Sequence, residues 1–145
     1  MTVDVDPIDE ALLQTAAEGA EEEEPEAEPG LYFGSVDEWF RKYWRYTYRR
    51  RVIGKAGTGH GRWKARWWER QEAIARLEAL WRGWEAARLD PTGMQAWWVM
   101  YADPHMAVLL SDTGPFGDSK DENEFGEPLP YERPPVGLFD PDLQP

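Results

Sequence analysis

The spacing of apolar residues between positions 65 and 88 constrains the fold more than any other feature of the sequence. These residues recur as on one face of an α-helix: Trp67, Ala73, Ile74, Leu77, Leu80, Trp81, Trp84 and Ala87. Glu72 and Arg76, four residues apart, favour the same helix on its exposed face. The turn-forming residues 90–93 follow as a stop signal. We predict an amphipathic helix over residues 65–88.

An earlier amphipathic helix is predicted to start at Ser35. Glu38 lies three residues later, which is the spacing of a capping box. The apolar stripe of this helix consists of Val36, Trp39, Phe40, Tyr43 and Thr47, and its cationic arc of Arg41, Lys42, Arg45 and Arg49. We expect the helix to end at residues 48–50, because continuing it would turn Arg50 onto the apolar stripe.

A third, shorter helix is predicted for residues 94–101. Asp103 and Pro104 have the pattern of a helix cap with proline in the first helical position. Residues 106–110 form either a last helical turn or a short strand, since periodicity does not separate the two. The fold class is therefore mainly α: a small three-helix domain over residues 31–116, with a short β element near 106–110 as the open alternative.

The net charge of −12 is distributed unevenly along the 145 residues. Residues 1–30 contain eleven acids and no base, residues 31–116 contain fourteen bases and nine acids, and residues 117–145 contain two bases and eight acids. Both ends are rich in acid and proline and poor in apolar residues, a composition that does not offset the entropy lost on ordering. We predict a basic, Trp-rich domain between two disordered acidic tails, residues 1–30 and 117–145.

The basic residues of this domain are concentrated in its first half. From Arg41 to Arg70 there are eleven Lys or Arg residues and one acid, interleaved with aromatic residues. Clustered cations neutralise phosphates and exposed rings stack on bases, so the segment is a candidate nucleic-acid surface. Its candidate binding residues are Arg41, Lys42, Arg45, Arg49, Arg50, Arg51, Lys55, Arg62, Lys64 and Arg66. The competing interpretation is that the rings form the core and the cations only cover its outer faces.

Binding through phosphates predicts low sequence specificity and a steep salt dependence. We expect DNA rather than RNA as the ligand. We also hypothesise that the acidic residues 1–30 occupy the basic face and screen out weak binding. The alternative function is a protein-interaction adaptor that docks an acidic or helical partner. An enzyme of unknown type is a distant third.

No catalytic residue, cofactor or metal site is predicted. The glycine-rich loop 54–61 matches neither phosphate-binding template, because it has no G-K-[ST] ending and no G-x-G-x-x-G after a strand. Neither His60 nor His105 has neighbours at a metal-ligand spacing. The sequence contains no cysteine, no signal-peptide pattern and no apolar run of ~20 residues, which predicts a soluble cytoplasmic protein with no membrane partner.

Several motifs carry a resemblance to a known family. They are Arg66-Trp67-Trp68-Glu69, the run R-L-E-A-L-W-R over residues 76–82, Asp103-Pro104-His105 and Gly114-Pro115-Phe116. They resemble an actinobacterial family known as a domain of unknown function, number 4913. Similar proteins come from plasmids, integrative elements and phages, so the resemblance implies an accessory module of a mobile element, a setting in which nucleic-acid handling is common. It implies no activity and no catalytic residues.

Overall fold

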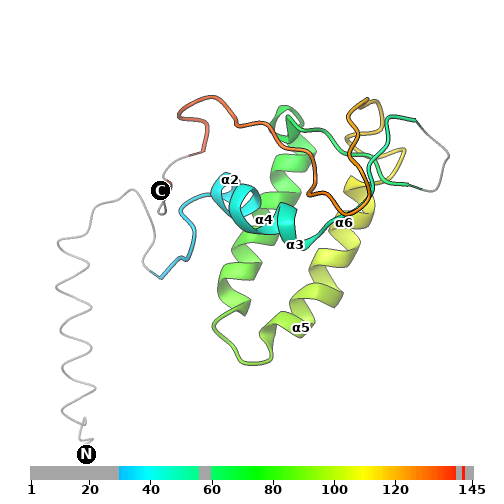
Figure 1. The fold of residues 1–145 in the computed structure, drawn as a ribbon. Helices are drawn as coiled ribbons and strands as arrows, with labels where there is room; N and C mark the ends of the chain where they lie inside the picture. The colour runs from blue at the N-terminus through cyan, green and yellow to red at the C-terminus, as the bar shows by residue number, and fades with distance from the viewer. Residues whose placement is uncertain (1–29, 56–59, 140–141, 143–145) are drawn as a thin grey trace, which may run out of the picture.

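The computed structural model describes residues 30–55, 60–139 and 142. In this part of the chain there are three helical segments and no strand, and one isolated bridge pairs Val52 with Gly61. The first helix joins α2 (Val36–Trp39), the π-helical turn η1 (Phe40–Trp44) and α3 (Arg45–Thr47). A 3-10 turn, η2 (Trp67–Glu69), precedes α4 (Gln71–Ala87), and the last helix joins α5 (Gly93–Trp97), the π-helical turn η3 (Trp98–Ala102) and α6 (Asp103–Leu109). Figure 1 shows this arrangement, which confirms the predicted mainly α, three-helix fold.

The first helix begins as its capping signal predicts. The backbone amide of Glu38 donates to Ser35 Oγ at 3.0 Å, and Glu38 Oε1 accepts from the amide of Gly34 at 2.7 Å. The second bond reaches one residue further back than a capping box requires, so Glu38 also orients the chain that enters the helix. The helix ends at Thr47, and Tyr48 has non-helical dihedral angles, in agreement with the predicted boundary.

The predicted start of the second helix at residue 65 is wrong. Residues near it form the separate turn η2, and α4 begins only at Gln71. The backbone of Ala65 is engaged elsewhere: its amide donates to Asp121 Oδ2 at 2.7 Å, and its carbonyl accepts from the amide of Glu132 at 2.9 Å. These bonds to residues more than fifty positions away replace helical ones, and local periodicity does not report them.

The last helix continues through Asp103 and Pro104, so the predicted break at a capping aspartate is also wrong. Asp103 has helical dihedral angles (φ −60°, ψ −50°). A proline inside a helix lacks an N–H and crowds the preceding turn. The π-helical turn η3 ends at Ala102, two residues before Pro104, and a wider turn at this place accommodates such a ring. Helical residues extend to Leu109, so the region 106–110 contributes a helical turn and not a strand.

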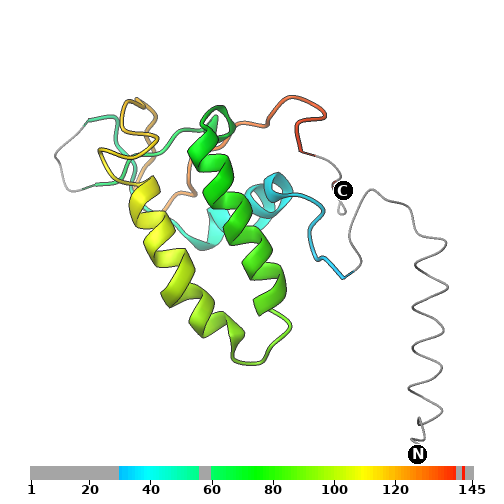
Figure 2. The same cartoon turned by 180° about the vertical axis from the view of Figure 1, so that it is seen from behind.

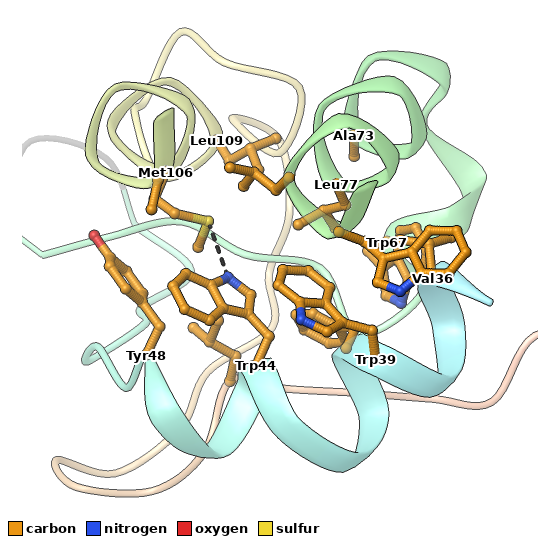
Figure 3. Packing of buried hydrophobic residues seen from close by; sticks show 14 of the residues in the cluster. Val36, Trp39, Trp44, Tyr48, Trp67, Ala73, Leu77, Met106 and Leu109 are labelled. Atoms are coloured by element: carbon orange, nitrogen blue, oxygen red, sulfur yellow. Dashed lines mark hydrogen bonds between the residues drawn. The ribbon is translucent and has the colours of Figure 1, made fainter. Parts of the chain in front are cut away.

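Aromatic side chains of the first helix fill the space between α4 and the last helix (Figure 3). Trp39 and Trp44 stack with ring centroids 5.4 Å apart, and Trp44 Nε1 donates to Met106 Sδ at 3.4 Å. Figure 2 shows α4 and the last helix side by side; across this pair the Trp97 indole N–H donates to the carbonyl of Leu80 at 3.1 Å. Large rings bury ~150–250 Å² each, so a few of them provide the buried apolar area that a small domain would otherwise lack.

Residues 117–139, here called the C-terminal segment, pass back over the first helix (Figure 1). Leu129 is fully buried in the core, and its amide donates to the carbonyl of Arg45 at 3.2 Å. Asn123 is also buried. The predicted disordered tail over residues 117–145 is therefore wrong for this segment, and the domain does not end at residue 116.

The predicted N-terminal tail, residues 1–30, lies outside the described residues except for Gly30. None of the helices in the described part of the chain is long and apolar enough to cross a membrane.

Candidate functional site

The ten predicted nucleic-acid-binding residues do not share one open cationic face. Among the residues that the structure describes, six of the ten form an ion pair with a carboxylate. These pairs, with their N–O distances, are Arg41–Asp37 (3.3 Å), Lys42–Glu38 (3.0 Å), Arg51–Glu124 (3.7 Å), Arg62–Asp112 (3.7 Å), Lys64–Glu69 (3.4 Å) and Arg66–Glu132 (2.9 Å). Each pair leaves less positive charge for a phosphate backbone.

The C-terminal segment changes the charge of the domain. All sixteen Lys and Arg of the chain and sixteen of its 28 Asp and Glu lie in the described residues, so this part carries no net charge. Three acids of the C-terminal segment, Asp118, Glu124 and Glu132, form ion pairs with cations of the basic region, and Asp142 pairs with Arg41. The excess of bases counted over residues 31–116 is thus balanced within the fold.

Arg62 holds the C-terminal segment in place. Its side chain is buried, with the residue only 2% exposed, and its Nη2 donates to the carbonyl of Ser119 at 2.6 Å. The Ser119 hydroxyl donates in turn to the carbonyl of Trp63 at 2.7 Å. A buried guanidinium group with these partners is structural and does not face a ligand. Lys55 is exposed at the start of the glycine-rich loop, of which residues 56–59 lie outside the described part.

Backbone carbonyls and aromatic rings, rather than carboxylates, hold three of the predicted cations within the described ranges: Arg45, Arg49 and Arg50. Arg45 Nε donates to the carbonyl of Leu129 at 3.0 Å, and Arg49 Nη1 to the carbonyl of Gly126 at 2.7 Å. The guanidinium carbon of Arg50 lies 4.0 Å from the centroid of the Tyr48 ring. Such contacts orient a guanidinium group without neutralising its charge.

These three residues and Arg51 follow one another closely at the end of the first helix, and we call them the arginine cluster. Arg45 and Arg49 both contact the ring of Tyr46, with guanidinium carbons 4.9 and 5.7 Å from its centroid. Arg51 differs from the others in its contact with Glu124, but that carboxylate is 84% exposed and an ion pair so close to water is weak. Within the described residues, the cluster is the part of the predicted basic face that is held mainly by backbone carbonyls and aromatic rings.

A pocket of about 410 Å³ lies beside the arginine cluster. It is lined by Arg50, Arg51, His60, Gly61, Ala107, Leu110, Ser111 and Phe125. The lining combines two guanidinium groups, an imidazole, a hydroxyl and an exposed aromatic ring, so the pocket suits an anionic ligand that also has a flat apolar surface.

Most of the rings that the sequence interleaves with cations belong to the core. Trp44, Trp63, Trp67 and Tyr48 are all buried. They are not available to stack on bases, so for these rings the competing interpretation of the sequence is the correct one. Tyr46 remains half exposed.

A second group of polar side chains lies at the start of the first helix and is satisfied internally. The Tyr131 hydroxyl donates to Asp37 Oδ1 at 2.8 Å, and Arg41 Nε donates to Asp37 Oδ2 at 3.3 Å. Burial raises the pKa of Asp37 above its usual value, although both of these partners lower it. Burial and the bond to Asp37 also raise the pKa of Tyr131. This group ties the C-terminal segment to the first helix.

The two histidines have different surroundings. His60 lines the pocket, whereas His105 Nδ1 lies 2.9 Å from Arg76 Nη1. Burial and the charge of Arg76 lower the pKa of His105. Within the described ranges, no group of three or more His, Cys, Asp or Glu side chains is placed to hold a metal ion.

The sequence analysis missed the residues that the C-terminal segment brings to the site, above all Phe125. The available signal was the occurrence of isolated apolar residues, Phe125, Leu129 and Tyr131, in an acidic stretch. Averaging the composition over residues 117–145 hides this signal, because these apolar residues are few and lie among many acids and prolines.

No curated protein and no solved structure matches the chain. The family described as "Domain of unknown function (DUF4913)" matches residues 33–135. The match covers most of the chain and extends well into the C-terminal segment, as the fold does. The chain therefore belongs to the DUF4913 family.

Proposed function

We propose that this domain binds nucleic acid with low sequence specificity through the arginine cluster, and not through all ten cations predicted from the sequence. The observation that carries the proposal is the way Arg45, Arg49 and Arg50 are held: within the described residues they contact carbonyls and rings and form no ion pair with a carboxylate. Several uncompensated guanidinium groups at one end of a helix are suited to a few phosphate contacts.

The hydrogen bonding of Arg45 supports this use. In the described part of the chain its guanidinium group donates through Nε alone, to the carbonyl of Leu129. Both Nη groups are left to donate to a ligand, and two such N–H groups match two oxygens of a phosphate. The cations that are paired with carboxylates are less suitable, because a phosphate would have to displace the carboxylate first.

The size of the cluster sets the expected salt dependence. Each neutralised phosphate contributes a log–log slope of about −0.9 on duplex DNA and about −0.7 on a single strand. Four arginines therefore predict a slope of roughly −3, whereas ten cations predict roughly −7 to −9. A site of four cations predicts weaker binding than a site made of all ten cations identified from the sequence.

The test is a fluorescence-anisotropy titration of the full chain with labelled oligonucleotides at several salt concentrations. The Arg49→Gln/Arg50→Gln variant removes two charges from the cluster. Arg66→Gln/Arg82→Gln is the matched control, because it removes two exposed arginines that pair with carboxylates. We expect the first variant to weaken binding about tenfold or more and the control to change it less than about twofold.

Equal losses in the two variants would show that only net charge matters and would overturn the proposal, as would a wild-type chain that does not bind. Arg49 Nη1 donates to the carbonyl of Gly126, so thermal unfolding of each variant is measured to confirm that binding is compared between folded proteins.

Docking of a helix from a protein partner is a second candidate function. Three consecutive residues of the last helix, Val99, Met100 and Tyr101, are each more than half exposed. Exposed apolar side chains on a helix are typical of a protein contact, and the apolar stripe of another helix complements them better than an acidic segment would. A photo-crosslinker at position 100 tests this in cells: one defined adduct supports it, and a diffuse ladder contradicts it.

The biological setting is also part of the proposal. The family resemblance suggests an accessory, non-enzymatic module of an actinobacterial plasmid, integrative element or phage. The absence of cysteine from the sequence favours a reducing compartment, the cytoplasm. Contact with DNA during the transfer or maintenance of such an element is a role that a small domain of low specificity fits.

A further inference from the structure

We infer that the arginine-cluster site takes single-stranded rather than duplex nucleic acid, with a base stacked on Phe125 and phosphates bound by Arg50 and Arg51. This inference rests on the proposed function and adds the form of nucleic acid that the site accepts.

Phe125 is an aromatic ring held outward on a defined turn. It is 91% exposed and takes no part in the buried core. The amide of Glu127 donates to the carbonyl of Glu124 at 3.0 Å, which closes a four-residue turn with Phe125 and Gly126 in its centre. Gly126 has a φ of +90°, the conformation that glycine supplies at the third position of a type II turn. Packing therefore does not explain why a phenylalanine occupies the preceding position.

Two hydrogen bonds, one just before the turn and one within it, fix it to the rest of the domain. Before it, the amide of Asn123 donates to the carbonyl of Val52 at 3.1 Å. Within it, the carbonyl of Gly126 accepts from Arg49 Nη1 at 2.7 Å. One member of the arginine cluster thus holds the turn that presents Phe125, so the ring and the cations keep a defined relation to each other.

Phe125 lines the same pocket as Arg50 and Arg51. A volume of about 410 Å³ falls in the range of small-ligand sites and exceeds what one flat base requires. Single-strand binding sites elsewhere combine a cationic track for the backbone with aromatic rings on which bases stack. The pocket places both components within one site.

A duplex fits this site less well for two reasons. Its bases are already stacked on one another, so a base would have to leave the helix to reach Phe125. Exposed acids also lie in the turn, Glu124 and Glu127, and just before it, Glu122, and they repel the dense charge of two strands more than that of one. A single strand exposes base faces and makes a narrower contact.

The test compares three labelled 12-nucleotide probes with the full chain by fluorescence anisotropy: an oligothymidine strand, an abasic strand of the same length and charge, and a duplex. We expect the oligothymidine strand to bind at least about fivefold more tightly than the duplex. Phe125→Ala should weaken oligothymidine binding about tenfold and leave abasic binding unchanged. Phe125→Trp retains a stacking ring and should retain the affinity. Val136→Ala, an equally exposed apolar residue of the same segment, is the matched control and should change nothing.

Failure of this inference is distinguishable from failure of the proposed function. If Phe125→Ala binds oligothymidine as the wild type does, or if the duplex binds as tightly, the single-strand inference is overturned. A loss of binding to all three probes in Arg50→Gln would then still support the proposed function. If the wild type binds none of the probes, both are overturned.

Discussion

Val52 and Asn123 exchange two hydrogen bonds although 71 residues separate them in the sequence. The amide of Val52 donates to Asn123 Oδ1 at 2.7 Å, and the amide of Asn123 donates to the carbonyl of Val52 at 3.1 Å. Asn123 Nδ2 also donates to the carbonyls of Arg50 and Pro128, at 3.1 and 3.0 Å. One buried amide side chain thus satisfies backbone groups next to the arginine cluster and within the C-terminal segment.

Replacing this side chain should destabilise the domain. In Asn123→Ala the buried amide of Val52 and the carbonyl of Arg50 lose their partner, and an unsatisfied buried polar group costs ~1–3 kcal/mol. We expect the free energy of unfolding in urea to fall by about 2–3 kcal/mol. Glu124→Ala, in the exposed turn nearby, should change it by no more than ~0.5 kcal/mol. Similar values for the two variants would contradict the anchoring role of Asn123.

Leu129 provides a second test that the C-terminal segment belongs to the fold. Its side chain is fully buried in the core, so Leu129→Ala should leave a cavity and cost about 2–5 kcal/mol in chemical unfolding. Val136→Ala, at an exposed position of the same segment, should cost less than ~0.5 kcal/mol. If residues after 116 formed a tail that does not pack, both substitutions would be neutral.

His105 should make stability depend on pH. Its pKa in the folded state lies below the ordinary value of about 6.5, because the imidazole is partly buried and faces Arg76. The unfolded state therefore binds the proton more readily, and stability falls as pH drops below about 6.5. We expect the urea midpoint of the wild type to decrease between pH 7 and pH 5 by more than that of His105→Gln. A parallel decrease in both proteins would contradict this assignment.

The acidic N-terminal residues should compete with nucleic acid for the arginine cluster. Replacing Glu21, Glu22, Glu23 and Glu24 by glutamine removes four tethered negative charges. We expect tighter binding of an oligothymidine strand at low salt, and a smaller difference at 0.5 M salt, where the Debye length falls to about 4 Å. Anisotropy titrations of the wild type and the variant at the two salt concentrations measure this difference in affinity. An effect that does not depend on salt would exclude an electrostatic origin.

Helix positions could be predicted from the sequence wherever local signals decide them. The Ser35–Glu38 capping pattern and the apolar stripe place the first helix within a few residues of its observed ends. The repeat from Ala73 to Ala87 likewise identifies α4. The errors have two causes. Ala65 bonds to distant residues of the C-terminal segment and so stays outside α4, and the last helix contains the π-helical turn η3 and continues past Pro104.

The candidate site could be predicted only in part, because its charge balance depends on tertiary contacts. The sequence identifies a run of cations, but the spacing along the chain does not show that Glu132 lies 2.9 Å from Arg66 or that Arg62 is buried. Arg45 and Arg49 belong to the proposed site because they donate to backbone carbonyls of the C-terminal segment and, among the described residues, do not pair with its acids. Composition alone contains neither distinction.

The most direct test of the central claim, that four arginines and not ten cations face the ligand, is the salt dependence of oligothymidine binding by the wild-type chain. A log–log slope of about −3 is expected, since each phosphate contact on a single strand contributes about −0.7. A slope near −7 would show that the ion-paired cations also bind phosphates and would contradict the claim, as would an affinity that does not depend on salt.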